Sequence, residues 1–127
     1  MIKIALVDDH SLLRMGLASL MESQGNTVLF EADNGKEFVN KLDANNLPQI
    51  VLMDINMPEM DGFEATRQIR LLEAATRRHT PIVAITANAM KGDRERCLDS
   101  GMDDYVSKPF DLKALHMLIE RWLAKRD

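Results

Sequence analysis

Near its amino end the chain reads Ile2-Lys3-Ile4-Ala5-Leu6-Val7-Asp8-Asp9, a short apolar run that ends in two acidic residues. A second stretch, Gln49-Ile50-Val51-Leu52-Met53-Asp54, has the same form. Runs that are apolar almost throughout are typical of strands buried on both faces of a parallel sheet. If these two strands are neighbours, all three carboxylates converge at the carboxyl edge of the sheet, where open α/β folds bind their ligands.

Apolar stretches of strand length alternate with longer segments of helical period along the rest of the chain. This alternation is the pattern of repeated βα units, and the chain contains no internal repeat or linker. The five expected strands are Ile2 to Val7, Thr27 to Ala32, Gln49 to Asp54, Ile82 to Thr86 and Asp104 to Val106. The sequence therefore predicts an α/β fold in which five helices accompany a parallel sheet.

Capping residues predict where two of the helices begin. Asn34 precedes Gly35-Lys36-Glu37 and Asp61 precedes Gly62-Phe63-Glu64, so a glutamate follows each cap three residues later. This spacing is the signature of a capping box. We therefore expect one helix to begin after Asn34 and another after Asp61.

Two further helices are predicted from apolar residues at helical spacing. The first runs from about Ser11 to Gln24 and ends at Gly25, a residue type that readily terminates helices. Its expected core face comprises Leu12, Leu13, Met15, Leu17, Leu20 and Met21. The last helix starts near Asp111, and its expected core face comprises Leu112, Leu115, Leu118, Ile119 and Trp122.

Length and composition restrict the class of protein. The 127 residues suit one compact domain spanning 1–127, and the net charge of −4 disfavours direct binding of nucleic acid by this domain. With one cysteine, Cys97, the chain cannot form an internal disulfide, and its amino terminus lacks the pattern of a secretory signal. No apolar run approaches the roughly 20 residues that cross a bilayer, so we expect a soluble, cytoplasmic protein without membrane contact.

The acidic edge predicts a metal site. Asp8, Asp9 and Asp54 supply hard oxygen ligands, and Mg²⁺ typically takes one or two carboxylates while keeping waters and a phosphate oxygen. A carboxylate can also act as a nucleophile toward phosphorus when cationic groups neutralise the transferred phosphoryl. Asp54 is the best candidate for such an aspartyl phosphate.

Two other polar residues end predicted strands at the same edge. Thr86 closes the fourth apolar run, where its hydroxyl can donate to a phosphoryl oxygen. Lys108 follows the fifth, and its ammonium group is a point charge suited to phosphate. His10 lies where a helix starts, so we expect a solvated or capping role for it. Each predicted phosphoryl contact therefore lies at the carboxyl end of a strand.

These residues occur in motifs that resemble the receiver domain of two-component response regulators, in the CheY-like superfamily. The motifs are Val7-Asp8-Asp9, Met53-Asp54-Ile55-Asn56-Met57-Pro58-Glu59-Met60-Asp61-Gly62, Ile85-Thr86-Ala87 and Ser107-Lys108-Pro109-Phe110. Jointly they are highly specific, and the resemblance covers essentially the whole chain. It implies a flavodoxin-like receiver fold, with a doubly wound sheet of five parallel strands in the order 2-1-3-4-5.

The resemblance also implies a phosphoacceptor role. Asp54 would accept a phosphoryl group from the phosphohistidine of a histidine kinase or phosphotransfer domain. Mg²⁺ would be held by Asp9, Asp54 and the backbone carbonyl of Asn56, and Asp8 would assist. The chain would then be a phosphoprotein of a two-component or phosphorelay system.

A conformational switch follows from the same resemblance. Thr86 and Lys108 would contact the phosphoryl group, and Tyr105 would reorient as the Thr86 hydroxyl is drawn inward. An ordinary half-buried strand aromatic is the alternative reading of Tyr105. The fourth helix, fifth strand and fifth helix would act on an output domain or target protein, with phosphorylation-dependent dimerisation as an option. Such a switch catalyses its own phosphorylation and dephosphorylation but is not an enzyme acting on a separate substrate.

Other function classes compete with this reading. A degenerate receiver that serves as a phosphorylation-independent docking module stays open, although every expected site residue is present. A phosphatase with an aspartate nucleophile needs a second aspartate two residues later, where this chain has Asn56. A flavin-binding electron carrier has no use for three carboxylates, and the Gly-rich loop of P-loop nucleotidases is missing from the sequence.

The motifs leave the output open. Val7-Asp8-Asp9-His10 resembles regulators that carry a DNA-binding helix-turn-helix domain, and a start at Met1 suits an amino-terminal receiver. The segments 61–66 and 86–90 look more like receivers fused to hybrid histidine kinases. A single-domain regulator is the third option.

Overall fold

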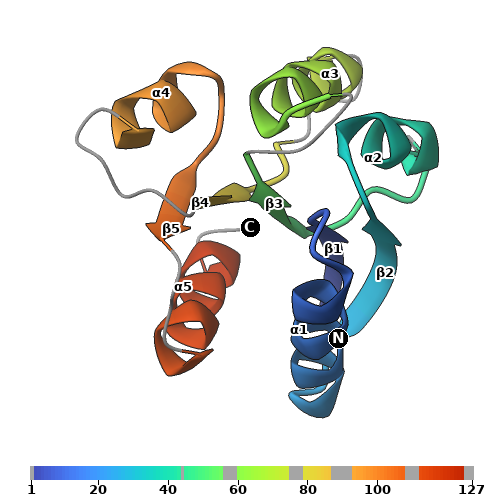
Figure 1. The fold of residues 1–127 in the computed structure, drawn as a ribbon, viewed down its shortest axis with the longest axis vertical. Helices are drawn as coiled ribbons and strands as arrows, with labels where there is room; N and C mark the ends of the chain where they lie inside the picture. Colours follow the sequence, from blue (N-terminus) through green and yellow to red (C-terminus); the bar gives the residue numbers. More distant parts are fainter. Residues whose placement is uncertain are drawn as a thin grey trace.

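The computed structural model describes residues 2–43, 45–55, 60–74, 79–86, 93–107 and 112–124. Within these residues strands and helices alternate along the chain (Figure 1). The strands are β1 (Lys3–Val7), β2 (Thr27–Ala32), β3 (Ile50–Asp54), β4 (Ile82–Thr86) and β5 (Asp104–Ser107). The helices are α1 (Ser11–Ser23), α2 (Gly35–Lys41), α3 (Gly62–Ala74), α4 (Asp93–Asp99) and α5 (Leu112–Ala124).

The strands form one parallel sheet in the order β2-β1-β3-β4-β5, which confirms the predicted doubly wound α/β fold. Every residue of β3 and β4 is buried, as expected for central strands covered on both faces. The boundaries differ from the prediction by single residues, since Ile2 and Gln49 precede their strands and β5 continues to Ser107. Because β1 and β3 are neighbours, with Val7 opposite Met53, the residues that end them emerge side by side.

Helices cover both faces of the sheet. α1 and α5 lie on one face, and α2, α3 and α4 lie on the other (Figure 1). On the α1/α5 face the buried core comprises Ile4, Leu6, Leu17, Ala18, Met21, Ile50, Leu52, Val83, Ile85, Leu115 and Ile119. On the opposite face it comprises Ala5, Val7, Ala32, Phe38, Val51, Met53, Ile55, Ala65, Ile69, Ile82, Ala84, Cys97 and Met102. Successive strand residues alternate between the two cores, because side chains along a strand point to opposite faces.

The predicted core face of α1 is only partly right. Leu17 and Met21 are buried, but Leu12 is 84% exposed and Met15 is 60% exposed. At about 100° per residue, Leu12 and Met15 point away from the direction that Leu17 and Met21 share. The prediction for α5 holds for Leu115, Leu118, Ile119 and Trp122, which are buried or pack against the core. Within the described ranges, no helix combines the length and the apolar character needed to cross a membrane.

Both predicted helix caps form. The Asn34 side chain accepts a hydrogen bond of 2.8 Å from the N–H of Glu37, and the Asp61 side chain accepts one of 2.9 Å from the N–H of Glu64. Each bond satisfies an N–H group that a helix start leaves without an intrahelical partner. The carboxylate of Glu37 reaches back to the N–H of Asp33 at 3.3 Å, one residue before the cap.

A polar network ties together the amino edge of the sheet, opposite the acidic residues. Arg70 of α3 donates two hydrogen bonds to the Gly101 carbonyl oxygen, at 2.7 and 2.9 Å. It also pairs with Glu73 at 2.6 Å and with Asp103 at 2.8 Å. Since the Asp103 carboxylate accepts the N–H of Ile82 at 2.8 Å as well, the network joins α3 to the start of β4.

Candidate functional site

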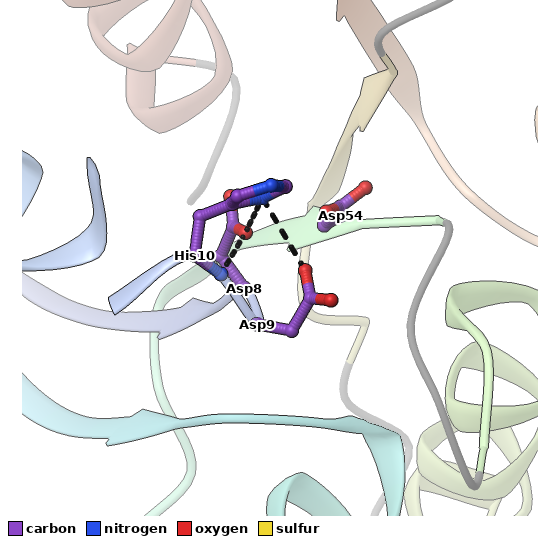
Figure 2. A group of neighbouring side chains, drawn as sticks. All are labelled: Asp8, Asp9, His10 and Asp54. Atoms are coloured by element: carbon purple, nitrogen blue, oxygen red, sulfur yellow. Dashed lines mark hydrogen bonds and ion pairs between the residues drawn. The ribbon is translucent and has the colours of Figure 1, made fainter. Parts of the chain in front are cut away.

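Three carboxylates converge at the carboxyl edge of the sheet, as the strand order requires. Asp8 and Asp9 follow β1, and Asp54 is the last residue of neighbouring β3. One potential ligand atom from each of Asp8, Asp9, Asp54 and the adjacent His10 lies within 4.8 Å of all the others (Figure 2). Asp8 is 2% exposed and Asp54 is 3% exposed, whereas Asp9 is open to solvent. We call these four residues the acidic cluster.

The electrostatics of the acidic cluster favour a bound cation. Two of its three carboxylates are almost removed from water, and like charges in such surroundings repel one another more strongly than in solvent. Carboxylate oxygens are the ligands that hard cations such as Mg²⁺ prefer, and the exposed side of Asp9 lets waters complete the coordination. The donor set therefore fits a divalent cation.

The start of α3 fixes the backbone that carries Asp54. Ile55 continues the sheet beyond β3 by donating its N–H to the carbonyl oxygen of Ile85 at 3.2 Å. The Ile55 carbonyl oxygen accepts the N–H of Gly62 at 3.1 Å, which draws the first residue of α3 onto the strand end. A Cβ atom at Gly62 would lie 2.8 Å from both the Asp54 carbonyl oxygen and the Ile55 Cα. This close approach requires glycine.

Arg14 of α1 holds the backbone of Asp8. Its guanidinium donates to the Asp8 carbonyl oxygen at 2.5 Å and pairs with Glu31 at 3.0 Å and Asp33 at 2.6 Å. Burial lowers the pKa of Arg14, but hydrogen bonds to Glu31 and Asp33 and the charges of both carboxylates outweigh burial, so the pKa is raised overall. The residue stays charged and connects β1, α1 and the end of β2. Sequence reasoning missed Arg14, because nothing in a helical pattern marks an arginine as the partner of a strand end.

His10 faces the carboxylates that precede it in the sequence. It is the N-cap of α1, but its side chain makes no capping hydrogen bond. Its Nδ1 atom lies 3.2 Å from Oδ1 of Asp8 and 3.4 Å from Oδ1 of Asp9 (Figure 2). The side chain is 68% exposed and the residue occupies the N-cap position, which agrees with the expected solvated or capping role except that the side chain gives no capping hydrogen bond. Its place directly after two aspartates was the signal in the sequence that could have indicated this contact.

The other predicted site residues are placed only in part. Thr86 ends β4 and is fully buried, one residue beyond the partner of Asp54 in the β3–β4 ladder. Tyr105 in β5 is half-buried and packs against the core beneath α2, α3 and α4. Asn56 and Lys108 lie outside the described residues, so the metal and phosphoryl contacts expected of them stay predictions.

The sequence matches a known protein family. The family model described as the response regulator receiver domain matches residues 4–120. Hybrid signal transduction histidine kinase I of Dictyostelium discoideum is 36% identical over 126 residues, which cover 97% of this chain. Since that match covers 7% of the kinase, the chain corresponds to a small part of its relative's length.

Solved structures share the fold over nearly the whole chain. The receiver domain of sensor histidine kinase PA1611 from Pseudomonas aeruginosa, described with a magnesium ion coordinated in its active site cleft, is 35% identical. The alignment covers 98% of both chains with a TM-score of 0.84. A chain from the co-crystal structure of the Saccharomyces cerevisiae histidine phosphotransfer protein Ypd1 with the receiver domain of its response regulator Ssk1 is 31% identical. That alignment covers 95% of this chain and 88% of the other, with a TM-score of 0.82.

Proposed function

Because this chain belongs to the family of response regulator receiver domains, we propose that it accepts a phosphoryl group on Asp54 from a phosphohistidine donor and changes conformation as a result. The observation that carries the proposal is the convergence of Asp8, Asp9 and Asp54 at the carboxyl edge of the sheet. One carboxylate oxygen from each of these residues lies within 4.8 Å of the others. Carboxylates crowded in this way repel one another and lower the stability of the fold. Ionisable groups in such unfavourable surroundings are concentrated at functional sites.

A divalent cation completes the proposed site. Asp9 and Asp54 would hold Mg²⁺ through their carboxylates and Asn56 through its backbone carbonyl, with Asp8 in support. The bound ion would neutralise charge that gathers on the transferred phosphoryl group. The magnesium ion described for the receiver domain of the Pseudomonas kinase supports this choice of ion.

The proposed transfer is a displacement at phosphorus. A carboxylate oxygen of Asp54 forms the new P–O bond while the P–N bond of phosphohistidine breaks. The released imidazole nitrogen keeps the electron pair of that bond and takes up a proton. The Thr86 hydroxyl and the Lys108 ammonium group then donate hydrogen bonds to the phosphoryl oxygens.

The phosphorylated state differs from the free state in its packing around β4 and β5. Thr86 is fully buried and pairs with Ser107 at the end of β5, so a shift of its hydroxyl toward the new anion disturbs this strand pair. Tyr105 is half-buried two residues earlier and is proposed to change its exposure in response. Phosphorylation thereby biases an existing equilibrium between two arrangements of the α4, β5 and α5 surface. The protein that this surface acts on stays a prediction. The same holds for phosphorylation-dependent dimerisation and for a cytoplasmic location.

The phosphodonor must dock beside the acidic cluster, and the outward face of α1 is suited to it. Leu12 and Met15 are 84% and 60% exposed there, next to exposed Gly16 and Ser19, and these four residues carry no charge. Exposed apolar side chains gathered on one helix face are typical of protein contact surfaces. Since α1 begins directly after His10, a phosphohistidine protein bound to this face has its reactive group near Asp54. The co-crystal structure of Ypd1 with the Ssk1 receiver domain supports this class of partner.

Phosphorylation of the purified protein tests the proposal. Incubation with Mg²⁺ and acetyl phosphate should add the mass of one phosphoryl group to the intact protein, and EDTA should prevent the addition. An Asp54→Asn variant should stay unlabelled. Asp61→Asn is the matched control, because asparagine caps a helix as well as aspartate does and should leave labelling intact.

Two results would contradict the proposal. Equal labelling of Asp54→Asn and the wild-type protein would overturn the choice of phosphoacceptor. A wild-type protein that binds Mg²⁺ but takes no label would favour a docking module that acts without phosphorylation.

A further inference from the structure

His10 gives the acidic cluster a nitrogen donor beside its oxygen donors. Its Nδ1 atom lies 3.2 Å from Oδ1 of Asp8 and 3.4 Å from Oδ1 of Asp9. Two ligand atoms that are each about 2.1 Å from one metal ion are separated by about 3.0 Å in an octahedral site and about 3.4 Å in a tetrahedral site. The two separations therefore match the edges of a coordination polyhedron around a single ion.

We propose that His10 is an additional ligand at this cation site and shifts its selectivity from Mg²⁺ toward first-row transition ions such as Mn²⁺ and Co²⁺. The inference rests on the metal site of the proposed function and adds a ligand to it. Mg²⁺ favours oxygen ligands, whereas imidazole suits the transition ions, whose affinity for such sites rises along the Irving–Williams order. A nitrogen donor among carboxylates therefore raises the affinity for Co²⁺ more than the affinity for Mg²⁺.

A neutral imidazole ring carries a proton on one nitrogen and offers the lone pair of the other nitrogen to a metal ion. In the tautomer that carries its proton on Nδ1, this atom donates a hydrogen bond to the Asp8 carboxylate at 3.2 Å. The side chain is 68% exposed, so water reaches the imidazole ring. In the tautomer that carries its proton on Nε2, the Nδ1 lone pair is available to an ion bound at the acidic cluster.

The backbone around His10 is already fixed in the position that the role requires. Its N–H donates to Oδ1 of Asp8 at 2.9 Å, and its carbonyl oxygen accepts the N–H of Arg14 at 3.0 Å. Arg14 in turn holds the Asp8 carbonyl oxygen. Because this main chain is held at both ends, binding an ion through the imidazole orders little more than the side chain itself.

Metal titration without any phosphodonor tests the inference. At about pH 8, where an ordinary imidazole is neutral, calorimetry should show His10→Ala binding Co²⁺ at least about tenfold more weakly than the wild-type protein. The Mg²⁺ affinity should change by less than about twofold. His79→Ala is the matched control, because His79 is also exposed and lies 2.5 Å from a carboxylate, that of Asp103, at the opposite edge of the sheet. It should leave the ratio of Co²⁺ to Mg²⁺ affinity as in the wild type.

Pulsed electron paramagnetic resonance of the Mn²⁺-loaded wild-type protein gives a second readout that needs no variant. A directly bound imidazole nitrogen should modulate the Mn²⁺ echo, and His10→Ala should lose this modulation while His79→Ala keeps it. Absence of nitrogen coupling in the wild-type protein, or an unchanged affinity ratio in His10→Ala, would overturn the inference. Either of these results would leave the proposed phosphorylation of Asp54 unaffected. If the protein binds Mn²⁺ through a nitrogen but Asp54 takes no phosphoryl group, the proposed function is contradicted and the role of His10 stands.

Discussion

The Arg14 guanidinium donates a hydrogen bond of 2.5 Å to the carbonyl oxygen of Asp8 and thereby joins α1 to the end of β1. The same guanidinium pairs with Glu31 in β2 and with Asp33 just after it. One side chain thus connects the three segments next to the acidic cluster. The Arg14 side chain is itself 12% exposed, whereas its carboxylate partners Glu31 and Asp33 are 36% and 58% exposed.

Replacing Arg14 by methionine should lower the free energy of unfolding by about 1–3 kcal/mol, because a buried carbonyl and two carboxylates lose a charged donor. Urea denaturation at neutral pH measures the change. Arg67→Met is the control, since Arg67 is 64% exposed and pairs with Glu64 on the surface of α3. Arg67→Met should lower the free energy of unfolding by less than about 0.5 kcal/mol. Equal losses for the two variants would show that Arg14 has no special structural role.

Gly62→Ala should destabilise the protein by about 1–3 kcal/mol, because the new Cβ atom has no room beside the strand end. That atom would lie 2.8 Å from the Asp54 carbonyl oxygen. Gly16→Ala is the matched control within α1, where a Cβ atom meets nothing within 4 Å. In this control the free energy of unfolding should rise by about 0.5–1 kcal/mol, because alanine has a higher helix propensity than glycine. Thermal denaturation of both variants should show a lower stability for Gly62→Ala and a higher stability for Gly16→Ala than for the wild-type protein. A stabilised Gly62→Ala protein would contradict the packing described for α3.

Asp54→Asn should be more stable than the wild-type protein in EDTA, by about 1 kcal/mol, because it removes one of the mutually repelling buried charges. Added Mg²⁺ should stabilise the wild-type protein by mass action and should stabilise the variant much less. Differential scanning calorimetry with and without Mg²⁺ measures both effects. A variant that is less stable than the wild type in EDTA would show that Asp54 contributes more to the fold than to the site.

Leu12→Asp should impair phosphotransfer from a phosphohistidine protein, because a charge on the outward face of α1 opposes the docking of an apolar surface. Acetyl phosphate needs no docking surface and serves as the reference donor for each variant. The rate with the protein donor, relative to the acetyl phosphate rate, should fall by about tenfold. Leu71→Asp on α3 is the control, since Leu71 is 61% exposed on a different face. An equal loss for Leu71→Asp would remove the case for docking on α1.

Lys108→Ala should still bind Mg²⁺, because the lysine supplies no metal ligand, but should lose the conformational response to phosphorylation. Hydrogen exchange of the acetyl phosphate-treated protein, compared with untreated protein, measures that response across α4, β5 and α5. An unchanged response would show that the lysine is dispensable for switching.

Residue types and their order along the chain were enough to predict the parallel sheet and its acidic edge. Strands buried on both faces must be apolar almost throughout, so β1, β3 and β4 were recognisable as runs, and their alternation with helices required a parallel sheet. Parallel strands bring their carboxyl ends to one edge whatever the details of packing. The convergence of Asp8, Asp9 and Asp54 also requires the two strands to be neighbours, an order that the resemblance to receiver domains implied and the structure confirms.

The contacts between side chains of different elements depend on how those elements pack in three dimensions. Helical spacing shows which residues share a face of α1, but packing against the sheet selects the face that is buried and leaves Leu12 and Met15 exposed. The contact of Arg14 with Glu31 joins residues 17 apart, and the contact of Arg70 with Asp103 joins residues 33 apart. Contacts between segments depend on how backbones pack in space, and neither residue type nor spacing encodes that arrangement locally.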